Sequence, residues 1–321
     1  MNTDTRVVAI GGGTGLSTML KGLKLHTHNI TAVVTVADDG GSSGMLRNDF
    51  GMLAPGDVRN CVSALAEVDP VMGELLNFRF KDGGLKGHSL GNLFLAALNE
   101  TSSSFDEAVK KFSHLAGIVG AVFPVTNEAV TLNAVLENGA VIKGESHIGV
   151  HREEPSSGIT RVELNPEKPK PVDGVIRAIE RADIIVLGPG SLYTSIIPNL
   201  LVDGVVEAIQ KSGAVKIYVC NIMSQAGETE GYTAYDHLSA IERHSYEGIA
   251  DIVIANNSPV PEGLKEKYAL EHACEVEMDS ARILTRSKLV QGNLLIVRND
   301  RIRHNFSRLA RTIMLLGTSA E

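Results

Sequence analysis

The residues best suited to chemistry in this chain follow an apolar run close to its first residue. Residues 7–10 are β-type, residues 11–15 read Gly-Gly-Gly-Thr-Gly, and residues 16–20 are compatible with a helix. Glycine allows a tight turn and a close approach of a ligand, and the first N–H groups of a helix favour a phosphate. The pattern predicts a nucleotide site, with a tight packing turn as the alternative. Its predicted ligands are Gly12, Gly13, Thr14 and Gly15.

The same turn departs from two well-defined phosphate motifs. Read as Gly13-x-Gly15-x-x-Thr18, it has threonine where the dinucleotide fingerprint needs glycine or alanine. No Gly-Lys-Ser/Thr follows, so the turn is not a P-loop. NAD binding, with Asp38 on the ribose hydroxyls, therefore stays open only as an alternative.

A second glycine turn follows another apolar strand. Residues 184–187 lead into Gly-Pro-Gly-Ser, and hydroxyl donors continue to residue 195. Successive backbone N–H groups in such a turn can form an anion nest. Two turns of this kind at the carboxyl ends of strands point to a ligand with at least one phosphate. The predicted ligands are Gly188, Pro189, Gly190, Ser191, Thr194 and Ser195, joined by Asn221 from the loop 221–230 after the next strand.

Two adjacent carboxylates, Asp38 and Asp39, end the second predicted strand and precede a Gly-Gly-Ser-Ser-Gly run. Such a pair is costly to bring together without a cation or a hydroxyl-bearing ligand. We expect both aspartates, with Ser42 and Ser43, to contact the ligand. In a transferase the aspartates would be catalytic and would hold Mg²⁺. The alternative is a pair of solvated carboxylates followed by helix-capping serines.

Two further polar turns precede predicted helices, at residues 53–60 and 86–93. In the first, an arginine could bind an anion, unless Asp57 is only a helix cap and the arginine faces solvent. The second places small donors at a helix start, although its histidine could equally be structural. The predicted ligands from these turns are Arg59, Asn60, His88, Ser89 and Asn92.

These turns need strands and helices to position them. Short β-branched runs alternate with helix-length segments, which is typical of a parallel sheet covered on both faces. Ligands of such sheets lie at the carboxyl ends of the strands. The predicted strands are Val7–Ile10, Ile30–Val36, Val141–Ile142, Ile184–Leu187, Lys216–Val219 and Ile252–Ala255. The predicted helices include Val58–Glu67, Val71–Phe78, Leu90–Glu100, Phe105–Leu115, Val172–Arg181, Val202–Lys211 and Ala234–Arg243.

The middle and the end of the chain differ from this alternating pattern of strands and helices. Residues 129–170 predict a small β-rich insertion, with strands at Ala129–Leu136, Ala140–Ile148 and Thr160–Leu164. Residues 292–321 form an Arg-rich C-terminal segment. Its arginines either form a solvated helix face or close an anion site or interface.

Composition excludes several classes of protein. The formal net charge is −8, which argues against broad binding to nucleic acid or to an anionic membrane. No apolar run reaches the length of a membrane span, so we expect none. The three cysteines, Cys61, Cys220 and Cys274, lack metal-site or disulfide spacing, and we expect buried free thiols in a cytoplasmic protein.

Six motifs between residue 10 and about residue 270 resemble those of the gluconeogenesis factor (YvcK-like) family, related to the CofD 2-phospho-L-lactate transferase group. They are Ile-Gly-Gly-Gly-Thr-Gly, Val-Ala-Asp-Asp-Gly-Gly-Ser-Ser-Gly, Pro-Gly-Asp-Val-Arg-Asn, Gly-His-Ser-Leu-Gly-Asn-Leu, Gly-Pro-Gly-Ser-Leu-Tyr-Thr-Ser and Asn-Ile-Met-Ser-Gln-Ala-Gly-Glu-Thr. The resemblance implies one Rossmann-like domain over residues 1–321, with a three-layer α/β/α core, in a homodimeric cytoplasmic protein. It also implies binding of UDP-sugars such as UDP-N-acetylglucosamine, and a role in gluconeogenic growth, cell shape and wall synthesis.

The transferase relatives move a phospholactyl-type group from a nucleotide to a deazaflavin alcohol with Mg²⁺. Their acidic pair near the acceptor and metal would correspond to Asp38 and Asp39. Aromatic residues make up only 4% of this chain and tryptophan is absent, so nothing specifies a deazaflavin pocket. The leading hypothesis is therefore a nucleotide-sugar-binding regulator that acts on an unidentified protein partner. The alternatives are a Mg²⁺-dependent phosphoryl or nucleotidyl transferase and an NAD-binding protein.

Overall fold

The computed structural model describes residues 4–67, 70–150 and 157–318. Its centre is a parallel sheet of seven short strands, whose β-branched sequences are buried on both faces in most of them. The strands are β1 (Val7–Gly11), β2 (Ile30–Val34), β3 (Ala121–Pro124), β7 (Ile184–Leu187), β8 (Val215–Val219), β9 (Ile252–Asn256) and β10 (Lys288–Gly292). The Rossmann-like α/β fold predicted for the chain is confirmed.

The strand order explains where a ligand can bind. It runs β10-β9-β8-β7-β1-β2-β3, with every neighbouring pair parallel. From β1 the chain first builds outward through β2 to β3, and later returns to add β7 on the other side of β1. The order therefore reverses between β1 and β7, and the carboxyl ends of these two strands form a topological switch point.

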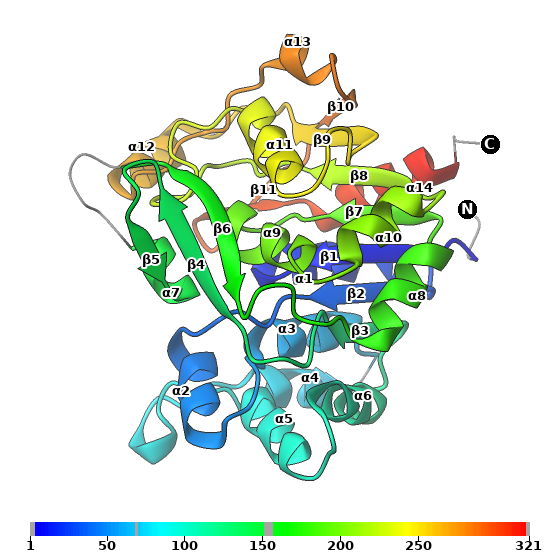
Figure 1. Ribbon diagram of the computed structural model, residues 1–321, viewed down its shortest axis with the longest axis vertical. Coiled ribbons are helices and arrows are strands. Elements are labelled where there is room, and N and C mark those ends of the chain that lie inside the picture. Colours follow the sequence, from blue (N-terminus) through cyan, green and yellow to red (C-terminus); the bar gives the residue numbers. More distant parts are fainter. Residues whose placement is uncertain (1–3, 68–69, 151–156, 319–321) are drawn as a thin grey trace.

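Helices cover the sheet in two sets. In one set, α1 (Gly13–Leu23) packs against α3 (Gly56–Leu65) and α14 (Phe306–Thr318). In the other, α8 (Asp173–Arg181) packs against α10 (Val205–Lys211), and both lie in front of the sheet in Figure 1. Apolar side chains from both sets join the sheet in one continuous core.

The insertion forms a separate antiparallel sheet. Its order is β5-β4-β6, with β4 (Thr131–Leu136), β5 (Val141–Lys143) and β6 (Ile159–Asn165). The strand predicted over 140–148 is wrong beyond Lys143, because 145–148 form the helical turn α7 (Glu145–Ile148). Gly144 has a φ of 91°, which ends the strand, and Asp39 accepts a hydrogen bond from the backbone N–H of Ser146 at 2.8 Å.

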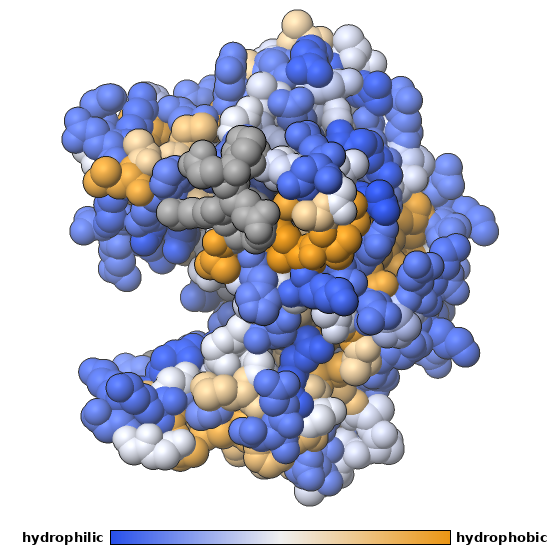
Figure 2. All heavy atoms as spheres, turned by 60° about the vertical axis from the view of Figure 1, so that its left-hand side comes forward, coloured by the Kyte–Doolittle hydropathy of each residue, from blue (hydrophilic) through white to orange (hydrophobic). Residues whose placement is uncertain are grey.

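A group of helices lies at the lower side of Figure 1. It contains α2 (Gly41–Phe50), α4 (Pro70–Asn77), the turn η1 (Gly83–Leu85), α5 (Leu90–Glu100) and α6 (Phe105–Leu115). The glycine- and serine-rich run after Asp39 begins helix α2, whose N-cap is Gly40. Figure 2, with the carboxyl-end side turned forward, shows the surface hollowed between this group and the rest of the molecule.

The remaining elements all follow β7 along the chain. The turn η2 (Leu192–Ile196) continues into α9 (Ile197–Leu200), and α11 (Ala234–Arg243) begins with a capping box of Thr233 and Asp236. The last part of the chain adds α12 (Glu262–Leu270), α13 (Ser280–Ile283) and the hairpin β11 (Leu295–Arg298) with β12 (Arg301–His304).

Two predictions from composition can be compared with this fold. Within the described ranges no single helix is long and apolar enough to cross a membrane, and one bent pair, Leu192–Leu200 with Val205–Lys211, reaches that length and composition only together. Cys61 and Cys220 are buried free thiols as expected, but Cys274 is exposed, because it follows α12 in a surface loop rather than in the sheet.

Candidate functional site

The first glycine turn joins β1 to α1 at the switch point. β1 ends at Gly11, Gly12 is extended, and α1 begins at Gly13. Gly12 has no side chain that could cap the first N–H groups of the helix. The carboxyl group of Asp57 accepts the N–H of Gly13, so the N–H groups that the positive end of the α1 dipole leaves for an anion are those that follow Gly13.

The second glycine turn lies directly against the first. It follows β7, and Gly188 has a φ of 80°, a backbone conformation that suits glycine. A Cβ on Gly15 would lie 2.5 Å from the carbonyl oxygen of Pro189, so the two turns are in backbone contact. The side-chain amide of Asn199, on α9, donates to the carbonyl of Gly11 at 3.1 Å and ties the same two segments together. Both turns therefore form one surface.

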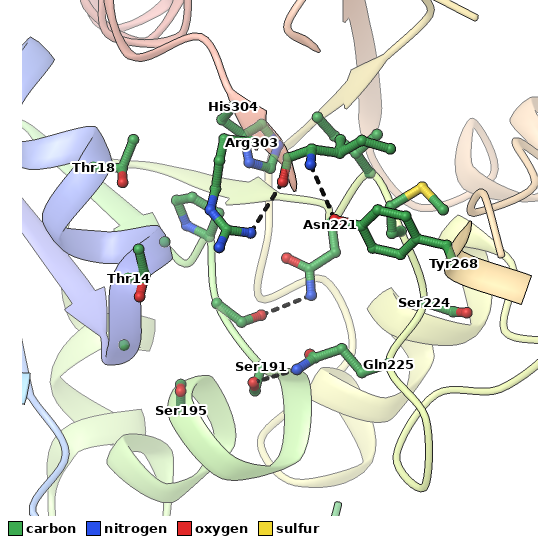
Figure 3. Close-up of a pocket in the computed structure, with 17 residues that line it drawn as sticks. Thr14, Thr18, Ser191, Ser195, Asn221, Ser224, Gln225, Tyr268, Arg303 and His304 are labelled. Atoms are coloured by element: carbon green, nitrogen blue, oxygen red, sulfur yellow. Dashed lines mark hydrogen bonds between the residues drawn. The ribbon is translucent and has the colours of Figure 1, made fainter. Parts of the chain in front are cut away.

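This surface is one wall of a crevice of about 310 Å³ (Figure 3). The predicted ligands that line it are Gly13, Thr14, Gly15, Pro189, Gly190, Ser191, Ser195 and Asn221. Asn221 Nδ2 donates to the carbonyl of Gly190 at 2.8 Å, and Gln225 Nε2 donates to Ser191 Oγ at 2.6 Å. The loop after β8 thus holds the second glycine turn in place.

The opposite wall comes from the last fifth of the chain. Tyr268 of α12 presents its ring there, and Arg303 of β12 directs its guanidinium into the space between Thr14 and Asn221 (Figure 3). Burial lowers the pKa of His304 to about 4, and its Nε2 donates to the carbonyl of Cys220 at 3.2 Å. Among the described lining residues, Arg303 is thus the charged side chain, and it is a cation.

A half-buried carboxyl group, that of Asp57, lies against the first glycine turn. A Cβ on Gly12 would lie 2.6 Å from Asp57 Oδ2. Burial raises the pKa of Asp57 to about 6, although hydrogen bonds from the Gly13 backbone and from Asn60 act in the opposite direction. The alternative that Asp57 is only a helix cap is wrong, because the N-cap of α3 is Pro55 and the carboxyl group of Asp57 contacts the first glycine turn instead.

Two glutamates add to this acidic region. Burial, followed by repulsion from Asp38, Glu228, Asp39 and Asp57, raises the pKa of Glu145 on α7 to about 8. Burial also raises the pKa of Glu228 to about 7, against hydrogen bonds from the backbone and hydroxyl of Thr194. Part of this carboxyl cluster is therefore protonated near neutral pH.

The acidic pair Asp38 and Asp39 lies within this cluster. Asp38 Oδ1 accepts the backbone N–H of Gly40 at 2.9 Å, and Asp39 Oδ1 accepts that of Ser146 at 2.8 Å. No three His, Cys, Asp or Glu side chains of the described residues converge as a metal site. Mg²⁺ commonly takes one or two carboxylates and completes its shell with waters and substrate phosphates. The pair therefore fits a Mg²⁺ ion that is shared with a phosphate ligand, but not a preformed protein cage.

The remaining predicted polar residues meet in a network between α2, α3 and α5. Asn92 Nδ2 donates to Ser42 Oγ at 3.1 Å, and Ser42 Oγ lies 3.1 Å from His88 Nδ1. Arg59 donates through Nε to Asn92 Oδ1 at 3.3 Å and through its terminal nitrogen to Asn77 Oδ1 at 2.8 Å. Burial lowers the pKa of Arg59, and its two described partners are both neutral amides.

The structure separates the predicted site residues into two regions. Most residues of the glycine turns line the crevice together with Asn221, but Gly12 and Gly188 do not. The predicted residues of the second strand and of the next two turns do not line it either. Ser43 packs against Gly56, Asn60 bonds Asp57, and Ser89 caps α5 by accepting the N–H of Asn92. Thr194 follows Ser191 closely, yet its hydroxyl is directed to Glu228 at 3.4 Å.

Several residues of the site were missed from the sequence. Tyr268, Arg303 and His304 have no local motif, although Arg303 belongs to the segment singled out for its arginines. Glu145 lay inside a segment predicted as a strand. Gln225 and Glu228 belong to the loop 221–230 that was expected to border the crevice, so its polar composition was the available signal.

Comparisons with known proteins agree with this geometry. The family model of the 2-phospho-L-lactate transferase CofD matches residues 7–295. A putative gluconeogenesis factor from Thermoanaerobacterium thermosulfurigenes is 53% identical over 310 residues, covering 96% of each chain. The gluconeogenesis factor from Bacillus subtilis is 43% identical over 312 residues, covering 97% of each chain.

A solved structure extends the similarity to three dimensions. The crystal structure of a UPF0052 family protein from Bacillus halodurans superposes with a TM-score of 0.93 at 43% identity, covering 97% of this chain and 100% of the other. Sequence and fold thus agree over nearly the full length. The chain belongs to the CofD family and, within it, to the gluconeogenesis factors.

Proposed function

We propose that this protein binds a nucleotide sugar of the UDP-N-acetylglucosamine type in the crevice and acts as a regulator. The observation that carries the proposal is the backbone contact between the two glycine turns, which builds one phosphate-sized wall at the switch point. The names of the relatives support a role in growth on gluconeogenic carbon sources. A part in cell shape and wall synthesis, in the cytoplasm, belongs to the same proposal.

Three features of the crevice suit a nucleoside diphosphate. The α1 N-terminus offers N–H groups, and Ser191 and Ser195 offer hydroxyls from the adjacent second turn on the same wall. Arg303 supplies a positive charge opposite them, and its planar guanidinium matches phosphate oxygens. The ring of Tyr268 provides a flat apolar surface for the base at the other end.

The arrangement favours binding over catalysis. In the described lining, Ser191 Oγ accepts a hydrogen bond from the amide of Gln225 rather than facing a general base. His304 Nε2 donates a hydrogen bond to the carbonyl of Cys220. Among the described residues, His304 makes no hydrogen bond to the hydroxyl of Ser191 or Ser195. The described residues that line the crevice therefore contain no nucleophile that is hydrogen-bonded to an activating base.

Calorimetric titration with UDP-N-acetylglucosamine, UDP-glucose, GDP and NAD tests the proposal. We expect the UDP-sugars to bind and the double variant Ser191→Ala/Ser195→Ala to bind them more weakly by about 1–3 kcal/mol. Ser113→Ala, on the distant helix α6, is the matched control and should bind normally. The absence of UDP-sugar binding at millimolar concentration would overturn the proposal, and preferential binding of NAD would favour the dinucleotide alternative.

The carboxyl cluster supports a second candidate, a Mg²⁺-dependent phosphoryl or nucleotidyl transferase. Asp38 and Asp39 would hold the ion together with ligand phosphates, and the ion would neutralise phosphate charge. Turnover that requires Mg²⁺ and disappears in Asp39→Asn would establish this activity. Ligand binding that is indifferent both to Mg²⁺ and to Asp39→Asn would exclude it.

We propose that the expected homodimer forms through the outer face of α4. Val71, Met72 and Leu75 are 63%, 45% and 44% exposed there, and Phe78 directly after the helix is 48% exposed. A contiguous apolar face of this kind is typical of an interface, and a second copy can cover it symmetrically. Sedimentation velocity should show a dimer that Met72→Glu/Leu75→Arg converts to monomer. A monomeric wild-type protein, or a dimer unaffected by the double change, would contradict this placement.

A further inference from the structure

A second cavity lies beside the end of α9 and shares no lining residue with the nucleotide crevice. It measures about 330 Å³, is open to the surface, and is lined by β6 and the residues after it, by the segment from the end of α9 into α10, and by the two residues after α11. Figure 1 shows β6 running past α9 at this place. Its walls are held by a defined contact, because the N–H of Val162 donates to His244 Nε2 at 3.0 Å while His244 Nδ1 donates to the carbonyl of Ala240 at 2.7 Å.

The cavity combines an apolar floor with an acidic rim. Val162, Leu164 and Leu200 form the floor and are buried. Among the described lining residues, four carry carboxylates, namely Glu163, Glu167, Asp203 and Glu207, and one, Lys168, carries a cation. Arg161 and Arg243 lie nearby and act on the lining residue His244. Glu163 is paired with Arg161 at 2.6 Å, whereas no salt bridge to the other three carboxylates is found in the described part of the chain.

The acidic rim and the apolar floor together indicate which kind of ligand the cavity can bind. A nucleotide or another polyanion would be repelled by the rim. A lysine or arginine side chain fits both parts, because its hydrocarbon stem can cover apolar surface while its charged end remains among carboxylates. An apolar residue beside that cation would fill the floor. The complementary ligand is thus a basic, partly apolar segment of another protein.

The cavity is also connected to the crevice through one short stretch of chain. Leu200 and Leu201 end α9 and line the cavity, while Ser191 and Ser195 open the same stretch and line the crevice. Asn199, next to the cavity floor, donates to the carbonyl of Ser195 at 2.8 Å and to that of Gly11 at 3.1 Å. A segment bound in the cavity would therefore contact the element that shapes the phosphate wall.

We propose that this cavity is the docking site for a basic, partly apolar segment of a partner protein, and that its occupancy and nucleotide-sugar binding influence each other. The docking part stands on the cavity alone. The coupling part rests on the proposed function, and linkage requires it to be reciprocal.

A peptide selection tests the docking part. A display library of random twelve-residue peptides is panned against the wild-type protein. The selected peptides are then measured by fluorescence anisotropy against two variants of equal charge change. The rim variant carries Glu167→Lys, Asp203→Lys and Glu207→Lys. The control variant carries Asp49→Lys on α2, Asp82→Lys directly before η1 and Glu100→Lys on α5. All six positions are exposed, so both variants should fold.

We expect enrichment of peptides with lysine or arginine next to an apolar residue. They should bind the wild type and the control variant alike, and the rim variant at least about tenfold more weakly. Selected peptides without basic residues, or equal binding to the rim variant, would overturn the docking proposal. Complete displacement by equimolar spermidine would also overturn it, since a free polyamine would then be the better occupant.

The coupling part has its own measurement. UDP-N-acetylglucosamine is titrated with and without a saturating selected peptide, and its Kd should change at least about fivefold. An unchanged Kd would overturn the coupling. If UDP-N-acetylglucosamine does not bind at all while the peptide does, the proposed function fails and the docking site stands.

Discussion

The carbonyl oxygen of Pro189 occupies the place that a side chain on Gly15 would need. A Cβ at Gly15 would lie 2.5 Å from this oxygen and 2.8 Å from the Pro189 carbonyl carbon. These residues are far apart in the sequence, and each belongs to a glycine turn at the end of a neighbouring strand. The requirement for glycine at position 15 is therefore set by the second turn as much as by a ligand.

Gly15→Ala should destabilise the protein and damage the crevice. Neither backbone can move easily, since both turns continue from strands of the central sheet, so overpacking should lower the free energy of unfolding by about 1–3 kcal/mol. Urea unfolding followed by circular dichroism measures this change. Gly73→Ala in α4 is the control, because a Cβ there meets nothing within 4 Å. It should leave stability unchanged or raise it by about 0.5–1 kcal/mol. Equal effects of the two substitutions would contradict the contact.

The carboxyl cluster should make stability fall as the pH rises above neutrality. The pKa values of Glu228 and Glu145 in the folded protein are about 7 and about 8, well above those of unfolded glutamate. The folded state therefore keeps protons that the unfolded state has released, and stability decreases with rising pH until these groups ionise. Each such proton contributes a slope of about 1.4 kcal/mol per pH unit.

The useful window is pH 6.5 to 8.5. Burial lowers the pKa values of His237, His244 and His304. Below the window these histidines therefore reduce the stability of the folded protein as the pH falls, which opposes the effect of the carboxyl groups. Urea unfolding across the window should show a negative slope that Glu145→Gln reduces. Glu100→Gln at the exposed end of α5 should not alter it. A flat wild-type profile would refute the prediction.

Much of the scaffold follows from local sequence patterns. The strands β1, β7, β8 and β9 were predicted because fully buried parallel strands are short, continuous and β-branched. Both glycine turns were predicted because a strand, a glycine run and a helix follow one another within a few residues. What neither pattern contains is the backbone contact between Gly15 and Pro189, which depends on the strand order.

The remainder of the site depends on tertiary packing. Tyr268 and Arg303 reach the crevice from an exposed helix and a small hairpin, elements whose positions no periodicity specifies. Glu145 lies in a segment with strand-like residues, and Gly144 together with the hydrogen bond to Asp39 turned it into α7. In each case a long-range contact determined the outcome over local propensity.

Arg303 should contribute strongly to the binding of any phosphate-containing ligand. It is the cation of the described crevice lining, and a charge-assisted hydrogen bond contributes about 1.5–3 kcal/mol. Arg303→Ala should therefore weaken UDP-N-acetylglucosamine binding about tenfold to hundredfold by calorimetry, and Arg303→Lys should restore part of it. Arg311→Ala, exposed on α14, is the matched control and should bind normally. Unchanged affinity in Arg303→Ala would place the phosphates elsewhere.

The exposed thiol of Cys274 should report ligand binding. Its Sγ lies 3.4 Å from Ser224 Oγ, and Ser224 lines the crevice, so a bound ligand would restrict access to this corner. Cys61 and Cys220 are buried, and burial raises the pKa of both thiols, that of Cys220 to about 12. A maleimide should thus modify Cys274 first, because the exposed thiol is the accessible nucleophile.

UDP-N-acetylglucosamine should slow that modification in proportion to occupancy, with half-protection at the Kd measured by calorimetry. Intact mass spectrometry over time gives the rate, and Cys274→Ser should abolish the fast phase. The double variant Ser191→Ala/Ser195→Ala should need correspondingly more ligand for the same protection, because it weakens binding without touching the thiol. If UMP and the UDP-sugar protect the thiol equally well at the same occupancy, the nucleotide part of the ligand lies beside Cys274. Protection by the sugar nucleotide alone would place the sugar there, and so the two ends of the crevice can be told apart.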